Sequence, residues 1–455
     1  MSSQRTLGIA FVVAGLFLAG CEQILHTGKV GNTKNAPSPD GTCPAGLSAC
    51  GTGTFAQCLD LQNDHAHCGA CDNACALGIA CAAGDCQQVA CTGPVTVSSQ
   101  TLPTGTNPTI PIRGAILADV NGDGRPDLVT WDYSGTIPGT FEVALGQAGG
   151  GFAAPATYQT ANGVDYITVA DSNGDGFDDL YVSDPYDSPC LQLWLGHADG
   201  KLTPSADLGD AGCTSPVVVA DLNGDGILDM VAYNPVEAAA PAVFLADAQG
   251  RFHVGTPLSV KHNAIAFLVR DWNGDGLPDL VNVAYDLSVF LNQGNGNFAE
   301  EMDCGVLTGR SEQAVVADFN HDGYLDVAAD IIEKGIGVLL GMGGCQFQPM
   351  VEYPLSGAVV ALVQGDLDGD GIGDLVARTS DGNVSLLRGA ADGSFEVSAL
   401  ASSVSCDVWC PLLVGDVTND GKVDVVVEGG SGVSSSGDQS TLVVQPTQIL
   451  GNACP

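Results

Sequence analysis

Basic residues are scarce in this chain of 455 residues. It carries 14 lysines and arginines against 53 aspartates and glutamates, a net charge of −39. Such a surface repels the phosphates of nucleic acids, so we exclude nucleic-acid binding. The seven histidines are scattered, and the motifs Gly-x-Ser-x-Gly and His-Glu-x-x-His and the phosphate-binding P-loop are all missing. We therefore expect a protein that is not an enzyme.

Long hydrophobic runs are also lacking. Residues 7–20 form the one extended apolar run, which is shorter than the roughly 20 residues of a membrane-spanning helix. Its place after Arg5 at the N-terminus is typical of an export signal, so residues 1–20 are interpreted as a signal peptide. The run ends in Leu18-Ala19-Gly20-Cys21, which resembles the bacterial lipoprotein box.

The lipoprotein resemblance implies cleavage before Cys21 and lipid attachment to its sulfur, so that the chain is a lipoprotein on a bacterial envelope membrane. We favour the outer membrane or cell surface over the inner membrane. A plain secretory signal that happens to contain this cysteine is the alternative. Residues 21–42 are polar and rich in Gly, Pro, Asn and Thr, and we interpret them as a flexible tether.

Residues 43–91 have little aliphatic bulk but hold nine of the 17 cysteines. In an exported chain this composition predicts a small module held together by disulfides. The run CLDLQNDHAHCGACDNACALGIACAAGDC, from Cys58, is similar to the cysteine-rich module of stigma-specific-type proteins. Zinc binding around His65, His67 and Cys68 is the alternative that we favour less.

One nine-residue phrase recurs seven times after this module, at intervals of 47 to 52 residues. A period in this range indicates a stacked repeat such as a propeller. The seven copies are DVNGDGRPD from Asp119, DSNGDGFDD from Asp171, DLNGDGILD from Asp221, DWNGDGLPD from Asp271, DFNHDGYLD from Asp318, DLDGDGIGD from Asp366 and DVTNDGKVD from Asp416.

The sequence around each phrase predicts four strands per repeat. Apolar and β-branched residues flank the acidic loop on both sides, and a second hairpin with a Gly-containing turn follows. The 3.6-residue apolar period of a helical solenoid is missing. These patterns predict an all-β fold, with a seven-bladed β-propeller over residues 92–455.

The seventh repeat ends before a fourth strand. The segment PVTVSSQTLPTG, from Pro94, is expected to complete this blade and close the ring. An open stack, or a last blade of three strands, is the alternative. Cys91 and Cys454 fall near the expected seam, and three possible disulfides, expected as local staples on outer hairpins, are Cys190–Cys213, Cys304–Cys345 and Cys406–Cys410.

Each phrase places oxygen atoms at positions one, three, five and nine, where they can converge on one hard cation together with the carbonyl of position seven. Gly at position six permits the tight turn. Calcium suits six to eight flexible oxygen ligands, and up to seven ions are expected. The candidate ligands are Asp119, Asn121, Asp123, Asp127, Asp171, Asn173, Asp175, Asp179, Asp221, Asn223, Asp225, Asp229, Asp271, Asn273, Asp275, Asp279, Asp318, Asn320, Asp322, Asp326, Asp366, Asp368, Asp370, Asp374, Asp416, Thr418, Asp420 and Asp424.

The phrases lack the Glu at position twelve that ends an EF-hand loop. They resemble instead the integrin-alpha-type FG-GAP repeat, also called the VCBS-like repeat, over roughly residues 110–445. The resemblance implies a seven-bladed propeller with calcium between the first two strands of each blade. The seventh loop, with Thr418 and Asn419, is expected to bind more weakly, and His321 at position four of the fifth loop is expected to matter little.

Several aromatic residues fall in loops or at strand ends, where they could contact a ligand or simply pack between blades. Together with the lipid anchor and tether, they suggest a surface binding or cell-adhesion protein with a protein or carbohydrate ligand. A structural role in an envelope assembly is the alternative, and a polysaccharide-acting enzyme a weaker one. The candidate ligand-binding residues are Trp131, Tyr133, Tyr186, Tyr233, Tyr285 and Trp409.

Overall fold

The computed structural model forms two compact units, one built largely of residues 97–365 and 374–447 and the other largely of residues 17–96. None of the described segments forms a helix with the length and apolar character that a membrane crossing requires. Short strands within residues 48–102 and 441–449 are described by their backbone alone. The other described residues are 112–132, 138–161, 163–183, 191–205, 208, 217–233, 241–248, 250–253, 256–261, 267–283, 286–305, 311, 313–331, 334–401, 411–419 and 421–429.

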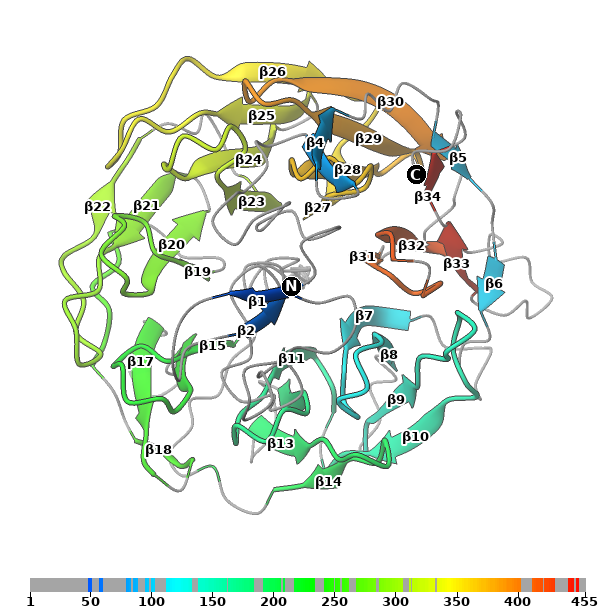
Figure 1. Cartoon of the computed structure of the whole chain (residues 1–455). Helices are drawn as coiled ribbons and strands as arrows, with labels where there is room; N and C mark the ends of the chain where they lie inside the picture. Colours follow the sequence, from blue (N-terminus) through cyan, green and yellow to red (C-terminus); the bar gives the residue numbers. More distant parts are fainter. Residues whose placement is uncertain are drawn as a thin grey trace, which may run out of the picture. The chain divides into compact units, whose positions relative to one another are not determined.

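Six four-stranded antiparallel sheets follow one another along residues 112–401, and within each sheet strands that are consecutive in sequence lie side by side (Figure 1). We number these sheets as blades 1 to 6. Blade 1 has β7 (Ile112–Ala118), β8 (Asp127–Asp132), β9 (Thr140–Ala144) and β10 (Ala156–Gln159); blade 2 has β11 (Tyr166–Ala170), β12 (Asp179–Ser183), β13 (Leu191–Leu195) and β14 (Thr203–Pro204); blade 3 has β15 (Val218–Ala220), β16 (Asp229–Tyr233), β17 (Pro241–Ala246) and β18 (Phe252–His253).

The next three blades repeat this order. Blade 4 has β19 (Phe267–Arg270), β20 (Asp279–Val283), β21 (Leu287–Phe290) and β22 (Met302–Asp303); blade 5 has β23 (Ala314–Ala317), β24 (Asp326–Ile331), β25 (Gly335–Leu339) and β26 (Val351–Pro354); blade 6 has β27 (Val359–Gly365), β28 (Asp374–Thr379), β29 (Val384–Gly389) and β30 (Phe395–Ala401).

The seventh blade is assembled from both ends of the propeller sequence. Its first three strands are β31 (Leu412–Gly415), β32 (Asp424–Gly429) and β33 (Thr441–Gln445), and its fourth is β6 (Gln100–Leu102). The pairing of β33 with β6 is antiparallel, with Val443 opposite Thr101. This confirms the prediction that the segment before the first repeat supplies the missing strand.

Contacts between the first strands of neighbouring blades close the ring. Strands β7, β11, β15 and β19 contact one another in sequence, as do β23, β27 and β31, and β31 contacts β7. Blades 4 and 5 share a core cluster that contains Leu268 of β19 and Val316 of β23. The seven-bladed, all-β prediction is therefore confirmed.

The strands are apolar on both faces because each blade is covered on both sides. In β20, Leu280 packs in a cluster with Val231 of blade 3, whereas the adjacent Val281 packs with Val327 of blade 5. Side chains alternate between the two faces of a strand, so consecutive residues fill consecutive interfaces. This explains the near-continuous apolar runs on either side of each acidic loop.

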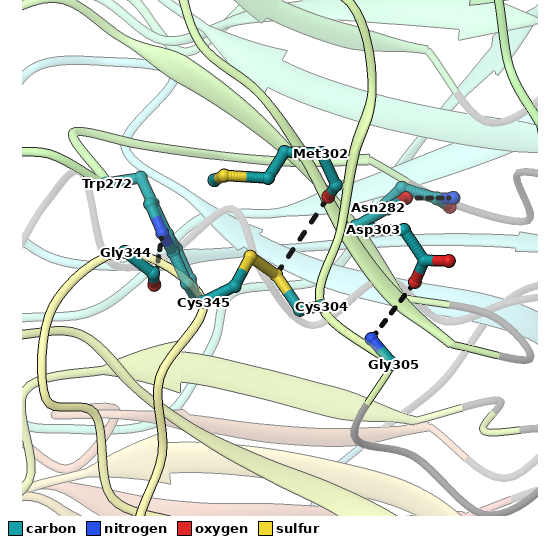
Figure 2. Close-up of a disulfide and its surroundings, with 9 residues drawn as sticks. Trp272, Asn282, Met302, Asp303, Cys304, Gly305, Gly344 and Cys345 are labelled. Atoms are coloured by element: carbon teal, nitrogen blue, oxygen red, sulfur yellow. Dashed lines mark hydrogen bonds between the residues drawn. A yellow bond between two sulfur atoms is a disulfide. The ribbon is translucent and has the colours of Figure 1, made fainter.

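A disulfide joins two blades. Cys304, just after β22 of blade 4, is bonded to Cys345 in the turn between β25 and β26 of blade 5 (Figure 2). The predicted pairing is confirmed, but its expected role as a local staple on an outer hairpin was wrong, because it crosses from one sheet to the next. The other cysteines proposed for pairing around the propeller, at 91, 190, 213, 406, 410 and 454, lie outside the described residues.

Three short two-stranded sheets lie outside the seven blades. Strand β1 (Ser48–Cys50) pairs with β2 (Gln57–Leu59), and β3 (Ile79–Ala82) pairs with β4 (Asp85–Gln88), where Cys81 lies opposite Cys86. Strand β5 (Val95–Val97) pairs with β34 (Thr447–Ile449). The proposed lipid site at Cys21 and the tether lie outside the described residues.

Candidate metal centres

Each nine-residue phrase connects the first strand of a blade to the second. In blade 1 the phrase begins at Asp119, directly after β7, and its last residue, Asp127, opens β8. The same holds in the other six blades, so all seven phrases occupy one equivalent connection. The predicted place of the loops, between the first two strands, is confirmed.

The loop is folded around the carboxylate of its first residue. In blade 1, Asp119 Oδ1 accepts the backbone N–H of Asp123 at 3.0 Å, and Asp119 Oδ2 accepts that of Gly124 at 2.8 Å. Asp171, Asp221, Asp271, Asp318 and Asp366 accept the equivalent pair of N–H groups in their own loops. The first aspartate therefore shapes the loop as well as offering oxygens to a cation.

This curl needs positive φ at two positions, whereas sequence reasoning had recognised only one. Gly122 at position four has φ 68°, and Gly124 at position six has φ 82°. His321 and Asn419 occupy position four of the fifth and seventh loops, with φ 56° and 55°. These two non-glycine residues adopt a left-handed backbone conformation, which is less favourable for them than for glycine. The expectation that His321 matters little for cation binding stays a prediction.

The side chains of positions three, five and nine converge. In blade 3, Asn223 Nδ2 donates to Asp225 Oδ2 at 3.1 Å and to Asp229 Oδ1 at 3.5 Å. Two carboxylates from different parts of the loop therefore point at one place. The Asn223 carboxamide is held in this orientation because its Oδ1 accepts the backbone N–H of Asp225 at 2.8 Å. Blades 4 and 5 repeat the pair of positions three and five at 2.8 and 3.0 Å.

The aspartate at position nine has a second role that sequence reasoning missed. Asp127 is fully buried; its Oδ2 accepts the N–H of Val120 at 3.1 Å, and its Oδ1 accepts that of Gly146, beyond β9, at 2.7 Å. The carboxylate thus ties the loop to the end of the third strand. The same two bonds recur at Asp179, Asp229, Asp279 and Asp326.

Burial raises the pKa of the aspartates at position nine, because it disfavours their charged form. It raises the pKa of Asp127 to about 7, and repulsion from Asp119 and Asp123 adds to the shift while the two backbone N–H groups oppose it. The pKa values of Asp229 and Asp326 are raised to about 6, again first by burial. A nearby cation would favour their charged forms.

The sixth loop has an additional carboxylate, because Asp368 replaces the asparagine at position three. Oxygens of Asp366, Asp368 and Asp374 lie within 4.8 Å of one another. Burial raises the pKa of Asp370 to about 6. The N–H of Ile372 opposes this shift, and repulsion from Asp368 adds to it. This loop has carboxylates at all four candidate ligand positions, one more than any of the other six loops, which favours cation binding.

The seventh loop is braced by blade 1. Asp416 Oδ2 accepts the N–H of Gly421 at 2.8 Å, as in the other loops. Asn419 Nδ2 donates to the carbonyl of Ala148 at 3.0 Å, in the turn between β9 and β10. Thr418 Oγ1 is buried and has no hydrogen-bond partner among the described residues. Asp420, at position five, lies outside the described residues.

The aromatic candidates do not gather into a described site. Trp131 is only 6% exposed; its Nε1 donates to the carbonyl of Asp165 at 3.3 Å, and its ring meets Tyr166 edge-on. Trp131 therefore packs between blades 1 and 2. Of the two roles considered for it, ligand contact or packing between blades, the structure shows the second. The side chain of Tyr233, and residues Tyr133, Tyr186, Tyr285 and Trp409, lie outside the described residues.

Comparison with known proteins agrees with this architecture. A family model described as "FG-GAP-like repeat" matches residues 119–182, 171–232, 271–329 and 366–427, just over half of the chain. A search of curated proteins finds no match.

Two solved structures are similar to this chain. BBS1N, solved in complex with ARL6DN, is 12% identical with a TM-score of 0.50, over 77% of this chain and 98% of that one. The BP39L lectin from Burkholderia pseudomallei is 14% identical with a TM-score of 0.54, over 76% of this chain and 98% of that one. At these identities the likeness shows the fold alone.

Proposed function

Because this chain belongs to the family of FG-GAP-like repeats, we propose that it is a calcium-stabilised binding protein, held on a bacterial cell surface by a lipid on Cys21. The observation that carries the proposal is the acidic loop that recurs between the first two strands of every blade. A closed propeller is a rigid body that presents many loops. Such a body suits the capture of a protein or carbohydrate ligand, including adhesion, without chemistry.

The residues of the loops fit a hard cation. Their donor atoms are carboxylate and carboxamide oxygens, which calcium prefers. In blade 3 the acceptors of Asp225 and Asp229 already converge on one donor, and in blade 7 the buried Thr418 Oγ1 has no partner among the described residues. Bound calcium would supply positive charge that offsets the repulsion among the aspartates of each loop. It would thereby stabilise the folded blades by mass action.

The N-terminal sequence supports display on a membrane. The segment that ends in Cys21, and the polar stretch of residues 21–42 after it, are suited to a lipid anchor and a tether. The ligand class is open between protein and carbohydrate. The similar structures do not choose between them, since one is named as a lectin and the other was solved bound to another protein.

Thermal unfolding of the full chain tests the calcium part of the proposal. We expect the melting temperature to fall in chelator, to recover with calcium, and to recover far less with an equal concentration of magnesium, which demands stricter octahedral geometry. A melting curve unchanged by chelator would overturn calcium stabilisation.

Two further measurements test the rest. Radiolabelled palmitate should be incorporated into the chain expressed in a bacterial host and not into the Cys21→Ser variant. Binding to arrays of glycans and of surface proteins should be found without turnover of the bound ligand. Turnover of an arrayed polysaccharide would favour an enzyme instead, and no binding on either array would favour a structural role in the envelope.

A further inference from the structure

The seven repeats can be compared with one another position by position, and blade 5 departs from the rest at its surface. At position seven of its loop stands Tyr324, which is 48% exposed. The other position-seven residues are charged or at least half-buried: Arg125, Phe177, Ile227, Leu277, Ile372 and Lys422. Blade 5 alone therefore exposes a large aromatic ring here.

Two more positions of the same blade depart. Met342, three residues beyond Leu339 at the end of β25, is 49% exposed. In blades 1 to 4 and 6 the equivalent residues are polar or small: Gln147, His197, Asp247, Gln293 and Ala390. In addition, exposed His321 replaces a glycine at position four. We call Tyr324, Met342 and His321 the blade 5 patch.

The patch rests on a turn that holds the Tyr324 ring in place. A Cβ atom added to Gly343 would lie 2.9 Å from Cε1 of Tyr324, so the ring covers this residue, whose φ is 90°. One side of the ring is therefore covered, and its 48% exposure leaves the other side open. A glycine is required at 343 both for the ring and for the backbone.

The turn between β25 and β26 is itself fixed to blade 4, as Figure 2 shows. Cys345 is bonded to Cys304, and Trp272 Nε1 donates to the carbonyl of Gly344 at 3.0 Å. The Trp272 ring also lies 6.2 Å from that of Phe347. The turn beside the patch therefore has a fixed backbone, and a surface built on a fixed backbone loses less conformational entropy when a partner binds.

Blade 1 shows which chemical group fits beside such a loop. There position seven is Arg125, whose Nη2 donates to Asp123 Oδ2 at position five and whose Nε donates to the carbonyl of Gly146 at 3.3 Å. Blade 5 has the equivalent carboxylate, Asp322, and the equivalent turn, but a tyrosine stands in place of the arginine. Asp322 Oδ2 accepts a hydrogen bond from Asn320 Nδ2 at 3.0 Å, but the loop of blade 5 has no arginine or lysine that places a positive charge beside this carboxylate.

We propose that the blade 5 patch docks a basic polypeptide segment, with an arginine of the partner stacked on Tyr324 beside Asp322 and an apolar side chain of the partner against Met342. Arginine stacks on aromatic rings and pairs with carboxylates, and tyrosine and methionine are enriched where proteins meet. The proposal rests on the binding function proposed above and names the class of its ligand.

The charge of the chain favours this partner over a neutral oligosaccharide. With a net charge of −39, the chain attracts a cationic partner, and seven divalent ions would still leave −25. A neutral sugar could stack on the ring but would gain nothing from this field.

The test uses the full chain with calcium and a short synthetic peptide of alternating arginine and leucine, with blocked ends, in titration calorimetry. We expect saturable binding that is weakened at least about fivefold by Tyr324→Ala and by Met342→Ser, in the range of interface anchor residues. The matched variants in blade 4, Leu277→Ala and Gln293→Ser, should bind as the native chain does. A peptide with lysine in place of arginine should bind more weakly at equal charge.

Three results would overturn the proposal: no binding of the arginine peptide, equal binding by the blade 5 and blade 4 variants, or equal binding of the two basic peptides. Tyr324-dependent binding of neutral oligosaccharides without binding of the basic peptide would assign the patch to sugars instead. The melting temperature of every variant, measured with and without calcium, separates the proposed calcium function from the proposed role of the blade 5 patch. If calcium still raises the melting temperature but the patch variants bind the peptide as the native chain does, only the patch assignment fails. If calcium does not raise the melting temperature of the native chain, the proposed calcium function fails.

Discussion

Asp178 of blade 2 reaches across to Asp119 of blade 1: its Oδ2 accepts the backbone N–H of Asp119 at 2.7 Å, and its own N–H donates to the Asp119 carbonyl at 3.0 Å. The two residues are 59 positions apart and belong to successive acidic loops. In the other repeats this eighth position is Pro, Leu, Gly or Val, so the bond joins these two loops through a side chain that no other repeat has.

The cross-blade carboxylate predicts a pH effect. Burial, together with repulsion from Asp119, Asp171 and Asp179, raises the pKa of Asp178 to about 6. An acid with a raised pKa binds its proton more tightly in the folded state, so its contribution to stability is present below the unfolded pKa near 3.8 and is lost as pH rises through 6. The calcium-free protein should therefore become less stable between pH 4 and pH 7.

Asp178→Asn isolates this effect, because the amide keeps an acceptor and cannot ionise. In chelator, we expect the variant to exceed the native chain in free energy of unfolding by about 1 to 3 kcal/mol at pH 8, and to match it near pH 4. Denaturant melts at the two pH values give the comparison. A variant that is destabilised equally at both would contradict the assigned titration.

Gly122 and Gly174 form a matched pair at position four. Their φ values are 68° and 72°, but a Cβ at Gly122 would lie 2.8 Å from the Phe177 ring of blade 2, whereas at Gly174 it would meet nothing within 4 Å. Both Ala variants should lose about 1 kcal/mol to left-handed strain. Gly122→Ala should lose about 1 to 2 kcal/mol more, because the ring must move. Equal losses in chemical denaturation would show that the two blades can separate freely here.

Substitutions at positions five and nine should distinguish the two roles of the loop aspartates, which are to hold the backbone and to bind a cation. Asp229 accepts two backbone N–H groups and is buried, so Asp229→Asn should leave one of them unpaired and cost about 1 to 3 kcal/mol even in chelator. Asp225 is exposed, so Asp225→Asn should change little in chelator but should reduce the stabilisation by calcium. Melting of both variants with and without calcium tests this; equal losses in chelator would argue against the structural role.

The disulfide between blades 4 and 5 should carry stability of its own. It closes 41 residues of chain, for which a loss of about 2 to 4 kcal/mol is typical on removal. Cys304→Ser combined with Cys345→Ser should lower the free energy of unfolding by this amount and so lower the denaturation midpoint. Reductant should then have a smaller further effect on the variant than on the native chain. An unchanged midpoint would mean that Trp272 and its neighbours hold the turn without the bond.

The spacing of the acidic phrases was enough to predict the blade count and the connection that carries each loop. The reason is that the repeated residues are local: an aspartate at position one, glycines at positions that need positive φ, and apolar strands on either side specify a turn within nine residues. The closing strand at Gln100–Leu102 was also predictable, because the seventh repeat was one strand short.

Contacts between blades were not predictable from the repeat. Nothing in the phrase indicates that Asn419 of blade 7 reaches Ala148 of blade 1, at the opposite end of the propeller sequence. Trp131 likewise could not be assigned to a surface or an interface until its neighbours were known. Such contacts depend on how two sheets twist and pack, which no single repeat encodes.

The sequence by itself determined the period, the blade, the acidic loops and the scarcity of positive charge, because these follow from residue type and short spacing. Only the tertiary structure decided which carboxylates are buried, which loops are joined, and that Tyr324 and Met342 stand out together on one blade. Exposure and proximity arise when seven sheets close on one another, and that closure brings together residues that are far apart along the chain.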